Sequence, residues 1–173
     1  TTNAMRLLMK ANVPFETSEY EVDESDLSGV HVATQLGLDV ERVFKTIVAK
    51  GDKTGHLVFC IPCHREIDLK RAAAVTGNKR VEPVQVKELL GLTGYIRGGC
   101  SPIGMKKRFP TYIEASAMSF DEITVSAGVR GAQLLLHSQL DAAKFYASCG
   151  YLQKGTPDKV QNVMHVWMYK KLF

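Results

Sequence analysis

The stretch Gly98-Gly99-Cys100-Ser101-Pro102-Ile103-Gly104 places three glycines, a serine and a proline within seven residues, so it cannot form a regular helix or strand. This composition predicts a tight loop whose backbone approaches a ligand or another segment. The basic run Lys106-Lys107-Arg108 follows at once. Alone, the loop fits a simple turn as well as the wall of a pocket, and the rest of the chain must decide between them.

The bulk properties predict one domain, or one domain with an appendage, because the chain has 173 residues of which 45% are hydrophobic. No apolar run is long enough to span a bilayer. The start, Thr1-Thr2-Asn3-Ala4-Met5, lacks the charged and apolar regions of a signal peptide. We therefore expect a cytoplasmic protein with reduced thiols and no membrane partner. The net charge of +4 permits RNA as a partner without requiring it.

The order of elements predicts an α+β fold, because strands and helices follow one another without steady alternation. We expect a mixed, barrel-like sheet with flanking helices rather than a doubly wound sheet. Helices are expected from the Asn3 cap to Asn12, over 31–36, after Asp68 up to Gly77, over 84–90, and from the Ser138 cap to about Gly150. Strands are expected over 15–22, 43–49, 56–62, 111–114, 123–126 and 132–137.

Lys45 lies within the otherwise apolar strand Val43-Phe44-Lys45-Thr46-Ile47-Val48. Alternation places it on the same face as Val43 and Ile47. If that face meets solvent, Lys45 is a routine surface lysine. If the sheet covers a pocket, its charge can stabilise a carboxyl, a phosphate or a developing oxyanion.

The segment Cys60-Ile61-Pro62-Cys63-His64 matches both a C-x-x-C redox pair and a C-x-x-C-H haem attachment site. Haem attachment needs export, and a redox pair favours a helix N-terminus, whereas this pair ends a predicted strand. A zinc site that adds Cys100 would lack a second C-x-x-C pair. The pattern therefore favours cysteines without a special role, and we expect neither a metal nor a cofactor.

A second glycine-rich segment, Gly128-Val129-Arg130-Gly131, follows Ser126 and a predicted strand. It is either a hairpin turn with a solvent-facing arginine or a clamp for an anion or carbonyl opposite the first loop. The sequence contains no G-x-S-x-G, H-E-x-x-H or P-loop motif. An enzyme with this sequence would work by positioning and backbone dipoles rather than by a side-chain nucleophile.

Four segments together resemble the YbaK/EbsC family of aminoacyl-tRNA deacylases, which is related to the editing domain of bacterial prolyl-tRNA synthetases. They are Phe44-Lys45-Thr46, residues 68–73, residues 93–108 and residues 125–131. The resemblance extends from about Ala4 to about Lys144. It predicts an editing domain over 1–144 and an extension of uncertain role over 145–173.

This resemblance implies that the protein removes wrongly attached cysteine from tRNA(Pro), with Cys-tRNA(Cys) as a further substrate. The alternatives are an Ala-tRNA(Pro) deacylase and a non-catalytic regulator that binds aminoacyl-tRNA or a synthetase. The family's route is substrate-assisted: the cysteinyl thiol attacks its own ester carbonyl while loop amides stabilise the oxyanion. Expected partners are aminoacyl-tRNA, prolyl-tRNA synthetase and a second copy of the chain.

The resemblance also assigns site residues. It implies catalytic roles for Lys45, Gly98, Gly99 and Ser101. It implies substrate contacts from Tyr20, Phe44, Thr46, Pro102, Gly104, Ser126, Gly128 and Arg130. Cys100 stands where the family has an aliphatic residue, so we expect its side chain to point into the core.

The tail from about Leu135 resembles the last third of a GNAT acetyltransferase, through residues 136–140, 145–146, 150–151 and 165–172. It lacks that family's loop for the acetyl-CoA pyrophosphate, so acetyl transfer is not expected. We expect a packing or dimerising extension made of a helix over 139–147 and one or two strands. Trp167 and Phe173 would be its buried anchors.

Overall fold

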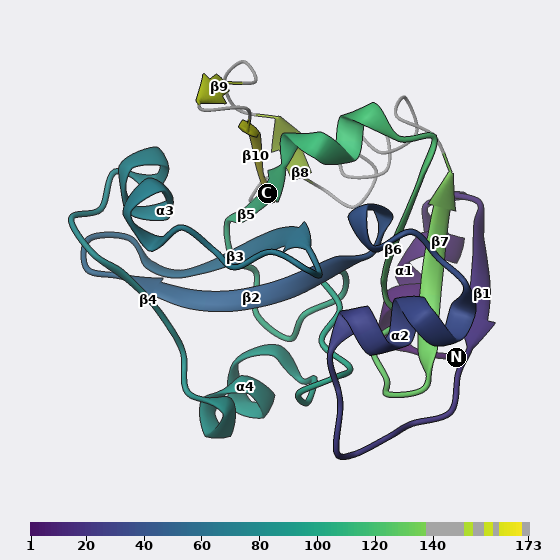
Figure 1. Cartoon of the computed structure of the whole chain (residues 1–173). Coiled ribbons are helices and arrows are strands. Elements are labelled where there is room, and N and C mark those ends of the chain that lie inside the picture. Colours follow the sequence, from purple (N-terminus) through teal and green to yellow (C-terminus); the bar gives the residue numbers. More distant parts are fainter. Residues whose placement is uncertain (138–150, 154–157, 161–162, 171–173) are drawn as a thin grey trace.

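The computed structural model describes residues 1–137, 151–153, 158–160 and 163–170, which form two sheets with helices packed around them (Figure 1). The smaller sheet has the antiparallel order β1-β7-β6. The larger sheet has the order β4-β2-β3-β5-β10-β8, with β9 paired to β10. Its strands are antiparallel except β3 and β5, which run parallel, so the sheet is mixed as expected. The strands are β1 (Phe15–Glu19), β2 (Phe44–Gly51), β3 (Gly55–Pro62), β4 (Val81–Pro83), β5 (Thr111–Glu114), β6 (Glu122–Ser126), β7 (Ala132–His137), β8 (Tyr151–Gln153), β9 (Asp158–Val160) and β10 (Val163–Lys170).

Capping residues mark the helix boundaries, and α3 has the boundaries that the sequence predicts. They are α1 (Asn3–Lys10), α2 (Gly29–Leu36), α3 (Leu69–Thr76), α4 (Val86–Thr93) and the 3₁₀ turns η1 (Val40–Arg42) and η2 (Ala115–Ser119). The Asp68 carboxylate accepts a hydrogen bond from the Arg71 amide at 3.1 Å, which caps α3. Gly77 ends the same helix with a φ of 74°, a left-handed conformation that glycine adopts without strain.

Three helix starts differ from the expectation. Helix α2 begins at Gly29, two residues before the predicted start, because Ser28 caps it. Thr2 rather than Asn3 caps α1, because its hydroxyl accepts from the Met5 amide while the Asn3 side chain donates to the Gly104 carbonyl. Pro83 ends β4 instead of opening a helix. Helix α4 starts after Gln85, whose amide donates to the Glu88 carboxylate at 2.8 Å, and it runs on to Thr93.

The two sheets meet at the start of β2, where Val43 forms a single parallel bridge with Thr124 of β6. One bridge does not continue a hydrogen-bonded ladder, so the described strands form no closed barrel. The α+β class with a mixed sheet and flanking helices is confirmed, and the barrel-like character is limited to this contact. The junction brings the start of β2 beside the end of the small sheet.

The core has a separate cluster under each helical layer. Helix α1 packs on the small sheet through Leu8, and Leu134 of β7 belongs to the same cluster. Helix α3 covers one face of β2 and β3, where Leu57 and Ala73 are buried. In Figure 1, α3 and α4 lie on opposite sides of the β2–β3 hairpin. Each fully buried leucine contributes roughly 1.5–3 kcal/mol of transfer free energy, which holds these layers together.

The tail adds strands to the large sheet. β10 pairs antiparallel with β5, and both β8 and β9 pair with β10. The sequence predicted one or two strands in the tail, and the structure describes three. The helix expected over 139–147 and the buried roles expected of Trp167 and Phe173 lie outside the described residues and side chains. Within the described part of the chain, every helix is too short or too polar to cross a lipid bilayer.

Candidate active site

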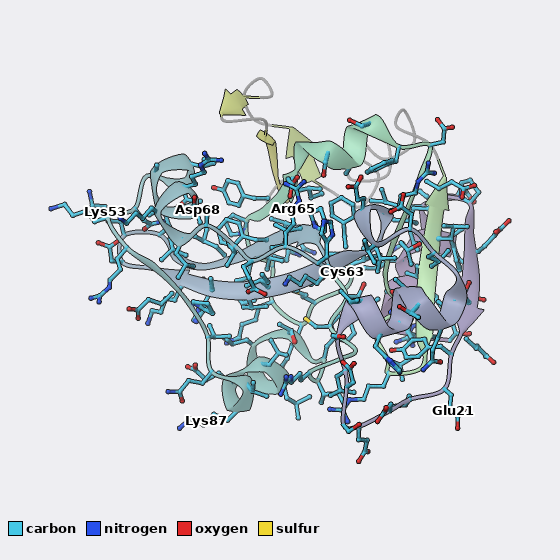
Figure 2. All side chains as sticks on the ribbon, in the orientation of Figure 1. Glu21, Lys53, Cys63, Arg65, Asp68 and Lys87 are labelled. Atoms are coloured by element: carbon cyan, nitrogen blue, oxygen red, sulfur yellow. The ribbon has the colours of Figure 1, made fainter. Side chains whose placement is uncertain are left out.

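A cleft of about 580 Å³ lies where the two sheets meet. Small-ligand sites commonly enclose roughly 300–1,000 Å³, so an amino acid and a nucleoside fit this volume. Five segments supply its walls: the loop before α2, the start of β2, the turn after β3, the first glycine-rich loop, and the end of β6 with the start of β7. Figure 2 shows Cys63 next to α2 at this junction, where it packs so tightly on Gly29 that no Cβ would fit there.

Lys45 supplies the positive charge of the cleft. Its Nζ lies 3.6 Å from the Glu66 carboxylate, and its side chain is 27% exposed whereas that of Glu66 is 96% exposed. An ion pair with so exposed a partner contributes at most about 1 kcal/mol, since water screens it. The Lys45 ammonium can therefore exchange Glu66 for an anionic or carbonyl ligand at little cost. Lys45 thus lines a cleft rather than an open face of the sheet, and its role toward a ligand stays a prediction.

The first glycine-rich loop begins with a type II turn. The Gly99 amide donates to the Ile96 carbonyl at 3.0 Å, and Gly98 at the third position has a φ of 84°. The Ile103 amide is also occupied, because it donates to Ser101 Oγ at 3.2 Å. By contrast, Gly98 and Cys100 both line the cleft, and their amides donate to no other described residue. These two amides are the donors that the loop can offer to an oxyanion.

The second glycine-rich segment packs directly on the first. A Cβ at Gly99 would lie 2.9 Å from the Arg130 backbone nitrogen, so only glycine allows this approach. The Arg130 Nε donates to the Arg97 carbonyl at 2.7 Å. At the start of the segment, the Gly128 amide donates to Ser126 Oγ at 3.3 Å. Glycine at position 99 thus lets the backbones of the two segments approach each other closely, as the composition of the first loop predicts.

The structure brings five of the predicted site residues together in the cleft wall: Phe44, Lys45, Thr46, Gly98 and Ser126. The others lie outside this wall. Gly99 and Arg130 form the contact between the two loops, Gly128 lies against the Tyr95 ring, and the Gly104 carbonyl accepts from Asn3. Tyr20 donates its amide to the Gly131 carbonyl at 2.9 Å. Ser101 and Pro102 are fully buried, so their side chains pack beneath the loop rather than facing the cleft. Direct substrate contact by these residues stays a prediction.

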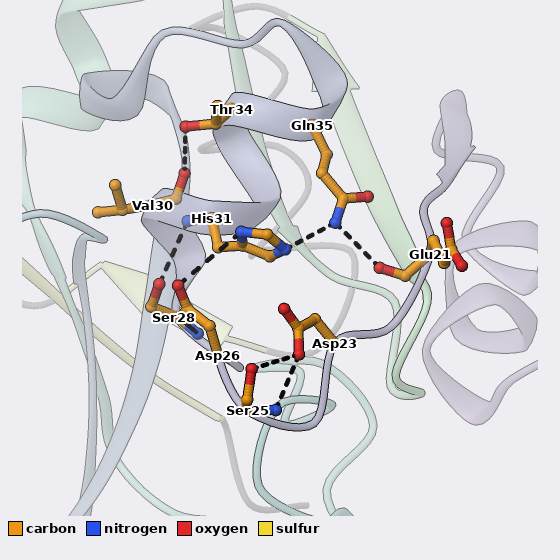
Figure 3. Close-up of polar contacts among 9 residues, drawn as sticks. All are labelled: Glu21, Asp23, Ser25, Asp26, Ser28, Val30, His31, Thr34 and Gln35. Carbon is orange, nitrogen blue, oxygen red and sulfur yellow. Dashed lines mark hydrogen bonds and ion pairs between the residues drawn. The ribbon is translucent and has the colours of Figure 1, made fainter.

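Sequence reasoning missed the loop before α2, which forms one wall through residues 25–30. Figure 3 shows how it is held: Asp23 accepts from Ser25, Asp26 accepts from the Ser28 amide, and Ser28 caps α2 by accepting from the His31 amide. Hydrogen bonds from the Ser28 side chain and backbone lower the pKa of Asp26. The alternation of Asp and Ser indicated turns and a helix cap, but no local pattern indicated a pocket wall.

The turn after β3 was also missed as a wall, although Cys63, His64 and Glu66 line the cleft. Burial raises the pKa of the Cys63 thiol, and the Lys45 charge opposes this shift. Burial raises the pKa of Cys60 to about 12 and that of Cys100 to about 11. None of these three thiols has the lowered pKa of a redox or nucleophilic cysteine. Among the described residues, no three side chains of metal-ligating type come together.

Cys100 meets the expectation for its side chain. It is 9% exposed and packs with Val48, Val58 and Tyr95 on the α4 side of the hairpin. The residue nevertheless also lines the cleft.

Comparison with known proteins places these features in a family. A family model described as "Aminoacyl-tRNA editing domain" matches residues 28–143. The chain is 50% identical over 135 residues to a protein of Enterococcus faecalis named "Putative Cys-tRNA(Pro)/Cys-tRNA(Cys) deacylase EbsC", covering 78% of this chain and 82% of that one. It is 28% identical over 105 residues to a proline--tRNA ligase of Thermosipho melanesiensis, covering 54% of this chain and 18% of the ligase.

The fold has solved counterparts. A crystal structure described as a "putative trans-editing enzyme for prolyl tRNA synthetase" superposes with a TM-score of 0.70 at 21% identity, covering 87% of this chain and 93% of that one. At that identity the likeness shows the fold alone. The sequence matches go further, since the family model covers more than half of the chain. This chain therefore belongs to the aminoacyl-tRNA editing domain family, as its YbaK/EbsC-like motifs predicted.

Proposed function

We propose that this protein is a trans-editing deacylase that removes cysteine from mischarged tRNA(Pro), and also from Cys-tRNA(Cys). The observation that carries the proposal is that Lys45 lines one cleft with Gly98 and Cys100, whose amides donate to no other residue in the described part of the chain. The name of the Enterococcus faecalis relative, which covers most of the chain, supports the cysteinyl substrates. The match within a proline--tRNA ligase supports tRNA(Pro) and makes that synthetase the candidate partner.

The proposed reaction needs no nucleophile from the protein. The cysteinyl thiol loses its proton and attacks its own ester carbonyl; a carbon–sulfur bond forms, and the carbon–oxygen bond to the ribose breaks. The ribose oxygen takes up a proton, and the amino acid leaves as a four-membered thiolactone that water opens. The amides of Gly98 and Cys100 stabilise the charge that develops on the carbonyl oxygen, assisted by Lys45. The raised pKa of Cys63 and the burial of Ser101 agree with a nucleophile that comes from the substrate.

A deacylation panel tests the function directly. Purified protein is incubated with Cys-tRNA(Pro), Cys-tRNA(Cys), Ala-tRNA(Pro) and Pro-tRNA(Pro), and release of the amino acid is followed. We expect rapid release of cysteine and none of proline. Lys45→Ala should lower the rate on the order of 100-fold, as loss of a transition-state contact does. Lys50→Ala is the matched control, because Lys50 is exposed on the same strand and lies outside the cleft.

The same panel separates the alternatives. Release of alanine without cysteine would assign an Ala-tRNA(Pro) deacylase. Binding of aminoacyl-tRNA without release, unaffected by Lys45→Ala, would assign a non-catalytic regulator. Ser-tRNA(Pro) tests the route, since its hydroxyl replaces the thiol at nearly the same size. Release of serine as fast as cysteine would contradict attack by the substrate's own sulfur.

A further inference from the structure

We propose that Arg130 is a positioning residue: its side chain holds the Arg97–Gly98 peptide so that the Gly98 amide points into the cleft. The inference rests on the proposed function, because the amide serves there as an oxyanion donor. Arg130 itself is not part of the cleft wall. Its effect on the reaction would therefore pass through the loop that it touches.

The turn geometry shows why this peptide needs holding. In the turn from Ile96 to Gly99, the peptide between Arg97 and Gly98 is the middle one. Type I and type II turns share the same end-to-end hydrogen bond and differ in the orientation of this middle peptide. The hydrogen bond from Gly99 to Ile96 therefore cannot choose between them. Glycine with positive φ permits the type II form, and an external partner can select it.

Arg130 is that partner. Its Nε donates to the Arg97 carbonyl oxygen at 2.7 Å, and a Cβ built on Gly98 would lie 3.3 Å from the same Nε. The peptide between Arg97 and Gly98 is trans, so the carbonyl of Arg97 and the amide of Gly98 point in opposite directions. Fixing the carbonyl on Arg130 turns the amide away from Arg130, toward the cleft that Gly98 lines.

Close contacts fix the position of the segment that carries Arg130. The Arg130 backbone lies against Gly99, where even a methyl group would not fit. The Tyr20 amide donates to the Gly131 carbonyl, which ties the same segment to the chain after β1. Within the described residues Arg130 forms no ion pair, so its Nε is committed to the loop rather than to a carboxylate.

Two conservative variants separate this role from attraction of a tRNA phosphate. Arg130→Gln keeps an N–H donor at the chain position of Nε but removes the charge. Arg130→Lys keeps the charge but puts a methylene at that position. We expect Arg130→Lys and Arg130→Ala to lower kcat about 10- to 100-fold with KM within about twofold, and Arg130→Gln to retain most of kcat. Arg80→Lys is the matched control, since the Arg80 Nε also binds a neighbour, Glu82, and both residues line a different pocket from the proposed site.

A second readout does not depend on catalysis. The backbone ¹H–¹⁵N signal of Gly98 should keep its position in Arg130→Gln and move or broaden in Arg130→Lys and Arg130→Ala. If the wild-type protein releases no amino acid, the proposed function fails. The Gly98 signal then still tests whether Arg130 orients the Arg97–Gly98 peptide. Full kcat in Arg130→Lys, a loss in Arg130→Gln that appears as a raised KM, or a Gly98 signal unchanged in all three variants would overturn the inference.

Discussion

The ring of Tyr95 lies so close to Gly128 that a methyl group at Gly128 would come within 2.8 Å of Tyr95 Cε1. The hydroxyl of the same tyrosine donates to the Ile103 carbonyl at 2.6 Å. One buried side chain therefore holds the end of the first glycine-rich loop and the start of the second. Gly98 and Cys100 lie in sequence between Tyr95 and Ile103, so the hydrogen bond between these two residues closes the loop that carries their amides.

Gly128→Ala should destabilise the fold more than a positive φ alone explains. The φ of 93° costs a non-glycine residue about 1–2 kcal/mol, and the contact with Tyr95 adds an overpacking cost of about 1–3 kcal/mol. Gly77→Ala is the control, because Gly77 has a φ of 74° and open space at its Cβ position. Urea denaturation gives both free energies of unfolding. An equal decrease in the free energy of unfolding in the two variants would contradict tight packing of Tyr95 on Gly128.

The buried thiols should resist alkylation in the folded protein at pH 8. Burial raises the pKa of Cys60 to about 12 and of Cys100 to about 11, so the reactive thiolate is rare until the pH approaches those values. Iodoacetamide labelling read by peptide mass spectrometry, with and without urea, checks this. Fast labelling of either thiol in the native protein would contradict the packing described for the hairpin.

The Asp23 carboxyl should titrate below 3.8, its ordinary value, because the Ser25 side chain and amide donate hydrogen bonds to it. A lowered folded-state pKa stabilises the folded loop above about pH 3.8, and this contribution is lost as the pH falls through the lowered value. Ser25→Ala should move the pKa of Asp23 back toward 3.8. Carboxyl ¹³C NMR measures the shift, and Asp26, whose hydrogen bonds come from Ser28, is the internal control. An unchanged Asp23 titration would show that the Ser25 hydroxyl is not its main partner.

Glu66→Gln should leave stability nearly unchanged and improve substrate binding. The Lys45 pair with this almost fully exposed carboxylate contributes little, so we expect the free energy of unfolding to change by less than about 0.5 kcal/mol. Removing a negative charge from the cleft wall should lower KM for the polyanionic tRNA about twofold, more at low salt. Glu82→Gln is the control, since Glu82 pairs with Arg80 away from the cleft. A large loss of stability or a raised KM in Glu66→Gln would contradict the exchangeable pair.

Much of the local structure follows from single residues. Asp68 and Gly77 bound α3 as their capping chemistry predicts, and the apolar pattern around Lys45 gave β2 within two residues at each end. The predicted start of α4 directly after Pro83 was wrong. The Gln85 amide donates to the Glu88 carboxylate, and this contact starts the helix after Gln85. The helix expected over 139–147 lies outside the described residues and stays a prediction.

The sequence by itself determined the elements, the two glycine-rich loops and the family, because caps, alternation and glycine chemistry act over a few neighbouring residues. Only the tertiary structure decided which groups face the cleft. Among the described residues, the amides of Gly98 and Cys100 have no acceptor, whereas the Gly99 amide donates to Ile96 within the turn. The Ser101 hydroxyl accepts from the Ile103 amide inside the core. The same holds for Arg130, whose partner Arg97 lies 33 residues away in sequence. Such contacts depend on how separate segments pack, and no local pattern records that packing.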